Sequence, residues 1–176
     1  MMINLPPQYR WLINEPGPKI LVEALKLYDT REAPGLVNNP EILAWATELG
    51  LHKVYRDDAT PWCGLFTGFV VKKAGKEPIK DPLWARNWAA WGSPTTPELG
   101  CVLVFSRGKT SGHVGIYVGE DAECYHVYGG NQSDRVCITR IPKDRLLAAR
   151  AMYNTKPANV RPVHLEASGV ISRNEA

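Results

Sequence analysis

Apolar positions in the first half of the chain recur three and four residues apart, which is the spacing of one face of an α-helix. Two such stretches follow Gly17-Pro18 and Asn39-Pro40, and an apolar run over residues 64–71 follows Thr60-Pro61. Proline suits the first position of a helix because its missing N–H would have no partner there. The pattern therefore predicts three helices, with Thr60 as the N-cap of the third.

The second half changes to short apolar runs that are rich in β-branched and aromatic residues and separated by glycine and polar turns. Helices followed by antiparallel strands predict an α+β fold. Residues 1–153 show no shift in composition, so we expect one domain there, and residues 154–176 lack periodicity and are expected to form a C-terminal tail or arm. The expected strands cover residues 101–105, 112–119, 123–128, 135–141 and 149–153, with a short helical turn over 142–147.

Charge and hydropathy exclude some classes of partner. The net charge of +3 is only mildly basic, and the Lys and Arg residues are scattered, so we expect no nucleic-acid partner. No apolar run approaches membrane-spanning length, so we expect no membrane insertion. Residues 1–7 lack the charged start and apolar core of a signal peptide, so synthesis in the cytoplasm is expected.

Cys63, in the first turn of the third predicted helix, is the first candidate for chemistry. A thiol becomes a nucleophile when its pKa falls and a base can take its proton. Unpaired backbone N–H groups and the positive end of the helix dipole favour a thiolate in that turn. A buried cysteine that only packs the helix is the alternative interpretation, so the function of Cys63 depends on a partner.

The expected partner is His113, which lies at the entrance of the strand over 112–119, where the backbone can hold an imidazole rigidly. Asn131 or Gln132, in a turn-rich stretch, could accept a hydrogen bond from the second ring nitrogen and so fix its tautomer. An ordinary hairpin turn would explain the same residues.

His126 competes for this orienting role. Side chains alternate along a strand, and Tyr125 and Val127 are the expected core-facing pair. His126 should then face solvent or a second layer, so the role is assigned to Asn131.

The order of four segments resembles one family of hydrolases. These segments are Pro61-Trp62-Cys63, the tryptophan-rich stretch 85–92, Gly112-His113-Val114-Gly115 and Gly129-Gly130-Asn131-Gln132. On them, roughly residues 9 to 153 resemble the CHAP and NlpC-type cell-wall peptidases, closest to the phage and prophage branch. The resemblance implies a papain-like fold with N-terminal helices packed on an antiparallel β-sheet. It also implies Cys63 as nucleophile, His113 as base and Asn131 as the polar third member.

The resemblance further implies a peptidoglycan hydrolase, an endopeptidase or amidase that acts on the cell wall after release or delivery. No cofactor and no metal are expected. Trp62, Gln132 and Trp88 are expected to line the cleft. Trp88 belongs to a helix that Asp81-Pro82 should open, with Trp84 and Trp91 on the same face, although such a stripe also suits a core.

Three other functions stay open. The first is a deamidase or acyltransferase on the same triad, and the second is a non-catalytic wall-binding or virion protein. The third is a zinc hydrolase, although neither a C-x-x-C nor an H-E-x-x-H spacing occurs in the chain. The four cysteines, at positions 63, 101, 124 and 137, show no close pairing and are expected to be free thiols.

Overall fold

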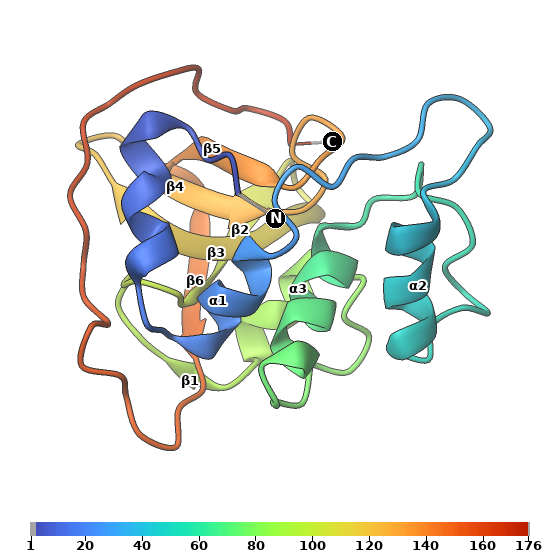
Figure 1. Ribbon diagram of the computed structural model, residues 1–176, viewed down its shortest axis with the longest axis horizontal. Helices are drawn as coiled ribbons and strands as arrows, with labels where there is room; N and C mark the ends of the chain where they lie inside the picture. Colours follow the sequence, from blue (N-terminus) through green and yellow to red (C-terminus); the bar gives the residue numbers. More distant parts are fainter. Residues whose placement is uncertain (1–2, 176) are drawn as a thin grey trace.

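The computed structural model describes residues 3–175. Helices dominate its first half and strands its second half, so the predicted α+β class is confirmed (Figure 1). The helices are α1 (Lys19–Leu25), α2 (Pro40–Glu48) and α3 (Cys63–Lys73), with the 3₁₀-helices η1 (Pro7–Asn14), η2 (Ala85–Ala90) and η3 (Lys143–Arg145). The strands are β1 (Ser93–Pro94), β2 (Val102–Arg107), β3 (Ser111–Glu120), β4 (Cys124–Gly129), β5 (Cys137–Pro142) and β6 (Leu146–Ala151).

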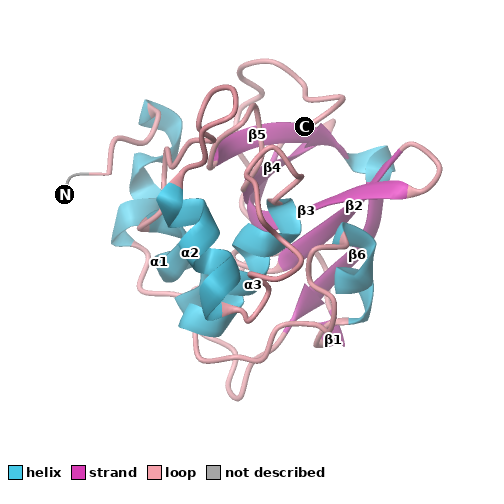
Figure 2. Cartoon of the chain, turned by 90° about the vertical axis from the view of Figure 1, so that its right-hand side faces the viewer, coloured by secondary structure: helices cyan, strands magenta, loops and turns pink. Residues whose placement is uncertain are grey.

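The strands form one antiparallel sheet in the order β1-β6-β2-β3-β4-β5. The sheet is curved, and α1, α2 and α3 lie together on one side of it (Figure 2). The register shifts once between β2 and β6 and once between β3 and β4, and such irregularities increase local twist. The β2–β3 hairpin places His113 opposite Phe105.

Both faces of the sheet are buried. Along β2, Val102 and Val104 pack into the core shared with the helices, whereas Leu103 and Phe105 join a second apolar cluster. Residues 63–71 of α3 are all buried, so this helix is enclosed rather than amphipathic. The enclosure fixes the position of the helix start. No helix within residues 3–175 combines the length and apolar character needed to cross a membrane.

The C-terminal segment, expected as a tail or arm, lies along the sheet (orange to red in Figure 1). The buried carboxylate of Glu175 accepts two hydrogen bonds from Arg145, at 2.7 and 2.9 Å. A bidentate pair of this kind holds both partners in a defined geometry. Backbone hydrogen bonds join Leu99 N–H to the Arg161 carbonyl, Glu120 N–H to the Val163 carbonyl and Ser172 N–H to the Arg140 carbonyl, each at 2.8 Å.

A buried polar network ties η1 to the sheet. One carboxylate oxygen of Asp121 accepts from Arg140 Nε and from His126 Nε2, each at 2.8 Å, and Nδ1 of His126 accepts from the Tyr9 hydroxyl at 2.6 Å. Burial lowers the pKa of His126, which favours this neutral ring. The Arg140 guanidinium holds the pKa of Asp121 well below its usual range.

Replacing Asp121 with Asn should lower the free energy of unfolding by about 3 kcal/mol at pH 7, because Arg140 would stay buried without its counter-charge. Asp29→Asn is the matched control. Asp29 is half exposed in its ion pairs, and asparagine tolerates its φ of 66°. Its removal should cost less than about 0.5 kcal/mol. Urea unfolding of both variants measures the difference.

The same measurement at low pH tests the cause. The pKa of Asp121 is lowered by folding, so its stabilisation is complete above the unfolded-state pKa of about 3.9 and is lost as the pH falls through the folded-state pKa. The gap between wild type and Asp121→Asn should therefore narrow at acid pH. An Asp121→Asn protein as stable as wild type at pH 7 would contradict the assignment.

Candidate active site

Cys63 is the first residue of α3, so the helix begins two residues later than predicted. Thr60 is not the N-cap, because its backbone N–H and hydroxyl both donate to Asp57, at 3.0 and 2.9 Å. Trp62 takes the N-cap position, and its side chain makes no capping hydrogen bond. The first turn of α3, which begins at the residue that carries the thiol, therefore receives no side-chain cap from Trp62.

His113 is 1% exposed, and its Nε2 lies 2.9 Å from Oε1 of Gln132. An amide oxygen only accepts, so Nε2 carries the proton in this arrangement. Within residues 3–175, the buried Nδ1 has no neighbour in good hydrogen-bond geometry, but the ring interacts with the Cys63 thiol. Because Gln132 occupies Nε2, Nδ1 is the nitrogen available to the proton of Cys63.

Gln132 orients His113, and this corrects the assignment of Asn131. The Gln132 side-chain nitrogen donates to the carbonyls of Val127 and Cys137, at 3.1 and 2.7 Å. These two acceptors fix the direction of the amide and leave its oxygen aimed at the imidazole. Gln132 is 1% exposed, so the prediction that it lines the substrate cleft is also wrong.

Asn131 shapes the turn that brings Gln132 under the ring. Its φ is 56°, a left-handed conformation that asparagine tolerates better than most residues. Gly130 lies against α3, where an added Cβ would be 2.6 Å from the Cβ of Phe66. The sequence identified this turn, but which side chain points inward depends on the sign of φ and on the contact with α3.

The surroundings of Cys63 favour a thiolate–imidazolium pair. Burial by itself raises the pKa of the Cys63 thiol, but the neighbouring His113 ring and its charge, the Val114 backbone N–H and the charge of Arg107 outweigh the burial and lower the pKa. Burial lowers the pKa of His113, but the interaction with Cys63 outweighs it, so the net shift is upward. Glu175 and Gln132 add to this rise. These surroundings therefore favour the thiolate of Cys63 more than water does.

Cys63 opens onto a cleft of about 310 Å³. Trp84, with 72% of its surface exposed, forms part of the wall. An added Cβ on Gly64 would lie 2.1 Å from the Pro82 oxygen, so glycine allows this wall to approach α3. The lining residues are Thr60, Pro61, Cys63, Leu83, Trp84, Ala85, Arg107, Ser111 and Gly112.

The predicted substrate contacts of Trp62 and Trp88 are wrong, because both side chains are fully buried. Trp62 donates to the Glu32 carboxylate at 3.1 Å, and Trp88 donates to the Pro82 carbonyl at 2.9 Å. The stretch that carries the tryptophans is a short 3₁₀-helix, Ala85–Ala90, with Trp84 before its start. The prediction that Trp84, Trp88 and Trp91 share one helical face therefore fails for Trp84, which lies outside the helix and faces the cleft instead of the core.

His126 does not contact His113, because it is committed to Asp121 and Tyr9 in the buried network. His126 was expected to face solvent or a second layer, and it is buried between the sheet and η1, which is such a layer. Over residues 3–175, no three His, Cys, Asp or Glu side chains are grouped so that they could hold a metal ion. The four cysteines are free thiols.

No family model matches the chain, and no curated protein matches it either.

Iodoacetamide at pH 7 should alkylate Cys63 at least about tenfold faster than the other three cysteines, since each unit of pKa changes the thiolate fraction tenfold. Burial raises the pKa of Cys101 to about 12 and also raises the pKa of Cys124 and Cys137. As the pH is lowered from 8 towards 6, Cys63 labelling should fall less than that of an ordinary thiol. Timed labelling with peptide mapping tests this, and faster labelling of Cys101 would refute it.

In Gln132→Ala, the pH below which the alkylation rate of Cys63 falls (the acid limb) should move to a higher value. Without Gln132 the His113 imidazolium is less well oriented and less stabilised, so it stabilises the Cys63 thiolate less. Asn131→Gly is the matched control, since glycine adopts the φ of 56° readily. It should leave the limb in place. A shift in the Asn131 variant alone would restore the original assignment.

Proposed function

We propose that this protein is a cysteine hydrolase that cleaves amide bonds through Cys63, His113 and Gln132. The observation that carries the proposal is the alignment of His113, with Nε2 bound to Gln132 and Nδ1 left for the thiol of Cys63. A nucleophile, a base and a residue that orients the base make up the minimal thiol-hydrolase site.

In the proposed reaction, the Cys63 thiolate attacks the substrate carbonyl and forms a C–S bond. The tetrahedral oxyanion is stabilised by backbone N–H groups at the start of α3, with that of Cys63 the nearest. The C–N bond then breaks, and the amine leaves with the proton from His113 Nδ1. Water hydrolyses the thioester in the second half: His113 takes a proton from water as it attacks, and the thiolate returns.

We further propose that the substrate is peptidoglycan and that the fold is of the papain-like CHAP and NlpC type. The order of the cysteine helix, the histidine strand and the following polar turn supports this assignment, together with helices before an antiparallel sheet. An exposed tryptophan at the mouth of an apolar cleft suits a peptide or sugar ligand. A phage or prophage lytic enzyme acting on the cell wall after delivery is the corresponding biological role.

Digestion of purified cell-wall sacculi, followed by mass spectrometry of the released fragments, tests the proposal. Wild type should release fragments with new amine and carboxyl ends, and Cys63→Ala should release none. His113→Ala should lose at least about 10²-fold in rate, which is the low end for a general base. Cys101→Ala is the matched control, because Cys101 is a buried thiol that lines neither the cleft nor the larger cavity described below, and it should keep its activity.

The same experiment separates the other functions. Ammonia release without chain cleavage would identify a deamidase, and transfer of an acyl group to an added amine would identify an acyltransferase. Wild type that binds sacculi but releases nothing would mark a non-catalytic wall-binding protein. Full hydrolysis by Cys63→Ala would refute the thiol mechanism.

A further inference from the structure

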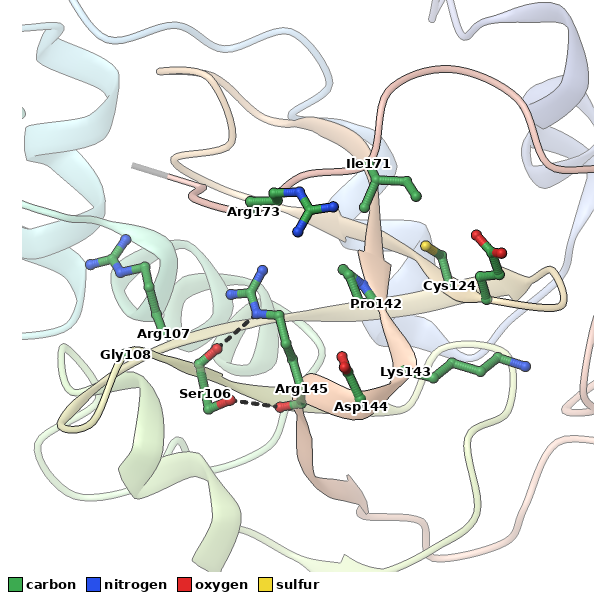
Figure 3. A pocket seen from close by; sticks show the side chains of 11 residues that line it. Ser106, Arg107, Gly108, Cys124, Pro142, Lys143, Asp144, Arg145, Ile171 and Arg173 are labelled. Carbon is green, nitrogen blue, oxygen red and sulfur yellow. Dashed lines mark hydrogen bonds between the residues drawn. The ribbon is translucent and has the colours of Figure 1, made fainter.

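A second cavity, of about 770 Å³, shares Arg107 with the cleft of Cys63, and Figure 3 shows the side chains that line it. Its walls come from the ends of β2 and β5, the start of β4 and η3 (Lys143–Arg145). The C-terminal segment adds Ile171 and Arg173. The segment expected to be a tail thus supplies one wall of this cavity.

Three guanidinium groups mark one part of the cavity. In Figure 3, Arg107 lies to the left of Arg145, Arg173 lies above it, and Asp144 lies below and to its right. The Arg145 guanidinium already has acceptors within the protein: it pairs with the buried Glu175 and donates to the Ser106 carbonyl at 2.9 Å. Its role is to hold the C-terminal segment in place next to Arg173.

Arg107 and Arg173 differ from Arg145, because within residues 3–175 neither guanidinium has a hydrogen-bond acceptor or a carboxylate partner. Arg107 is half-buried and Arg173 is exposed. The positive charge of Arg107 also acts on the Cys63 thiol, but no carboxylate neutralises it within residues 3–175. A half-buried guanidinium of this kind attracts an anion more strongly than a fully hydrated one.

Arg107 lines both the large cavity and the cleft that contains Cys63. The two cavities are therefore neighbours joined at this side chain. A peptide with its reactive carbonyl at Cys63 can extend past Arg107 into the large cavity. A negative group on that peptide would meet Arg107 first and Arg173 beyond it.

We propose that the large cavity is a substrate subsite in which Arg107 and Arg173 bind a carboxylate of the peptide cleaved at Cys63. The proposal rests on the proposed hydrolase function and adds the substrate class, an acidic peptide. A guanidinium binds a carboxylate through paired N–H groups, so the site distinguishes a carboxylate from the corresponding carboxamide.

Lys143, Glu123 and Asp144 also line the cavity, so the wall carries charges of both signs. The two carboxylates would repel a polyanion such as a nucleic acid or a polyphosphate chain. A peptide carboxylate needs only the arginine side of the cavity. Inorganic phosphate shares this chemistry, so it serves as a competing probe.

The test measures binding of two peptides to the Cys63→Ala protein, in which no turnover can occur. The first is L-Ala-γ-D-Glu-L-Lys-D-Ala with a free D-Glu α-carboxylate and an amidated C terminus, and the second carries a carboxamide in place of that carboxylate. The acidic peptide should bind several-fold more tightly. Arg173→Gln should weaken it about three- to fivefold, as expected for one exposed ion pair, and leave the amide peptide unchanged.

Arg10→Gln is the matched control, because Arg10 is an exposed arginine on η1 and lines neither cavity. It should bind both peptides like the parent protein. Arg107→Gln should reduce the preference for the carboxylate further. Millimolar phosphate should compete with the acidic peptide and not with the amide peptide.

The outcomes separate the subsite from the hydrolase function. Equal binding of both peptides, or an unchanged preference in Arg173→Gln, would refute the subsite even if wild type digests sacculi. An arginine-dependent preference for the acidic peptide, in a protein whose wild type cleaves nothing, would keep the subsite and refute the hydrolase. Tighter binding of phosphate than of the acidic peptide would replace the peptide carboxylate with a phosphate ligand.

Discussion

The candidate site depends on the position of one imidazole ring. His113 is buried, so its charge is stable only where partners replace the lost water. Gln132 holds Nε2 at 2.9 Å, and the thiol of Cys63 is the partner left for Nδ1. If the ring rotated, Nε2 would lose its acceptor and the thiol would lose its base. The rest of the fold can be understood as support for these two contacts.

Support comes first from the two elements that carry the pair. Helix α3 is enclosed on all sides, which prevents Cys63 from shifting, and β3 lies in the interior of the sheet between β2 and β4. The turn after β4 packs on α3 at Gly130. Gln132, which contacts the His113 imidazole, belongs to the same turn, so its position is tied to that of the helix that carries Cys63. The three side chains of the candidate site therefore come from three segments in mutual contact.

The C-terminal segment contributes a negative charge that acts on His113 and one wall of the large cavity. The carboxylate of Glu175 is held by Arg145, and its negative charge helps to raise the pKa of His113. The same pairing fixes Arg173 at the rim of the large cavity. Positive charge at Arg107 lies on the substrate side of Cys63, and negative charge at Glu175 acts on His113. Both charges favour the separated thiolate and imidazolium.

The sequence alone determined the α+β class, most strand positions and the pairing of Cys63 with His113. These features follow from local rules: apolar periodicity, proline at helix starts, and a thiol and an imidazole at the ends of regular elements. The sequence also located the turn at 129–134. It did not select Gln132 over Asn131, because the two residues are adjacent in the chain and both carry a side-chain amide.

Only the tertiary structure decided that choice and the walls of the cleft. Asn131 takes a left-handed φ, and the next side chain then points back to His113. Trp62 and Trp88 are buried by packing against distant segments, while Trp84 is left exposed because the helix starts after it. The C-terminal residues show no periodicity of apolar positions, so their position in the fold follows only from their contacts with the sheet and with Arg145. The contacts of His113 with Gln132, of Trp62 with Glu32 and of Arg145 with Glu175 join residues 19 or more positions apart, and local spacing carries no record of such contacts.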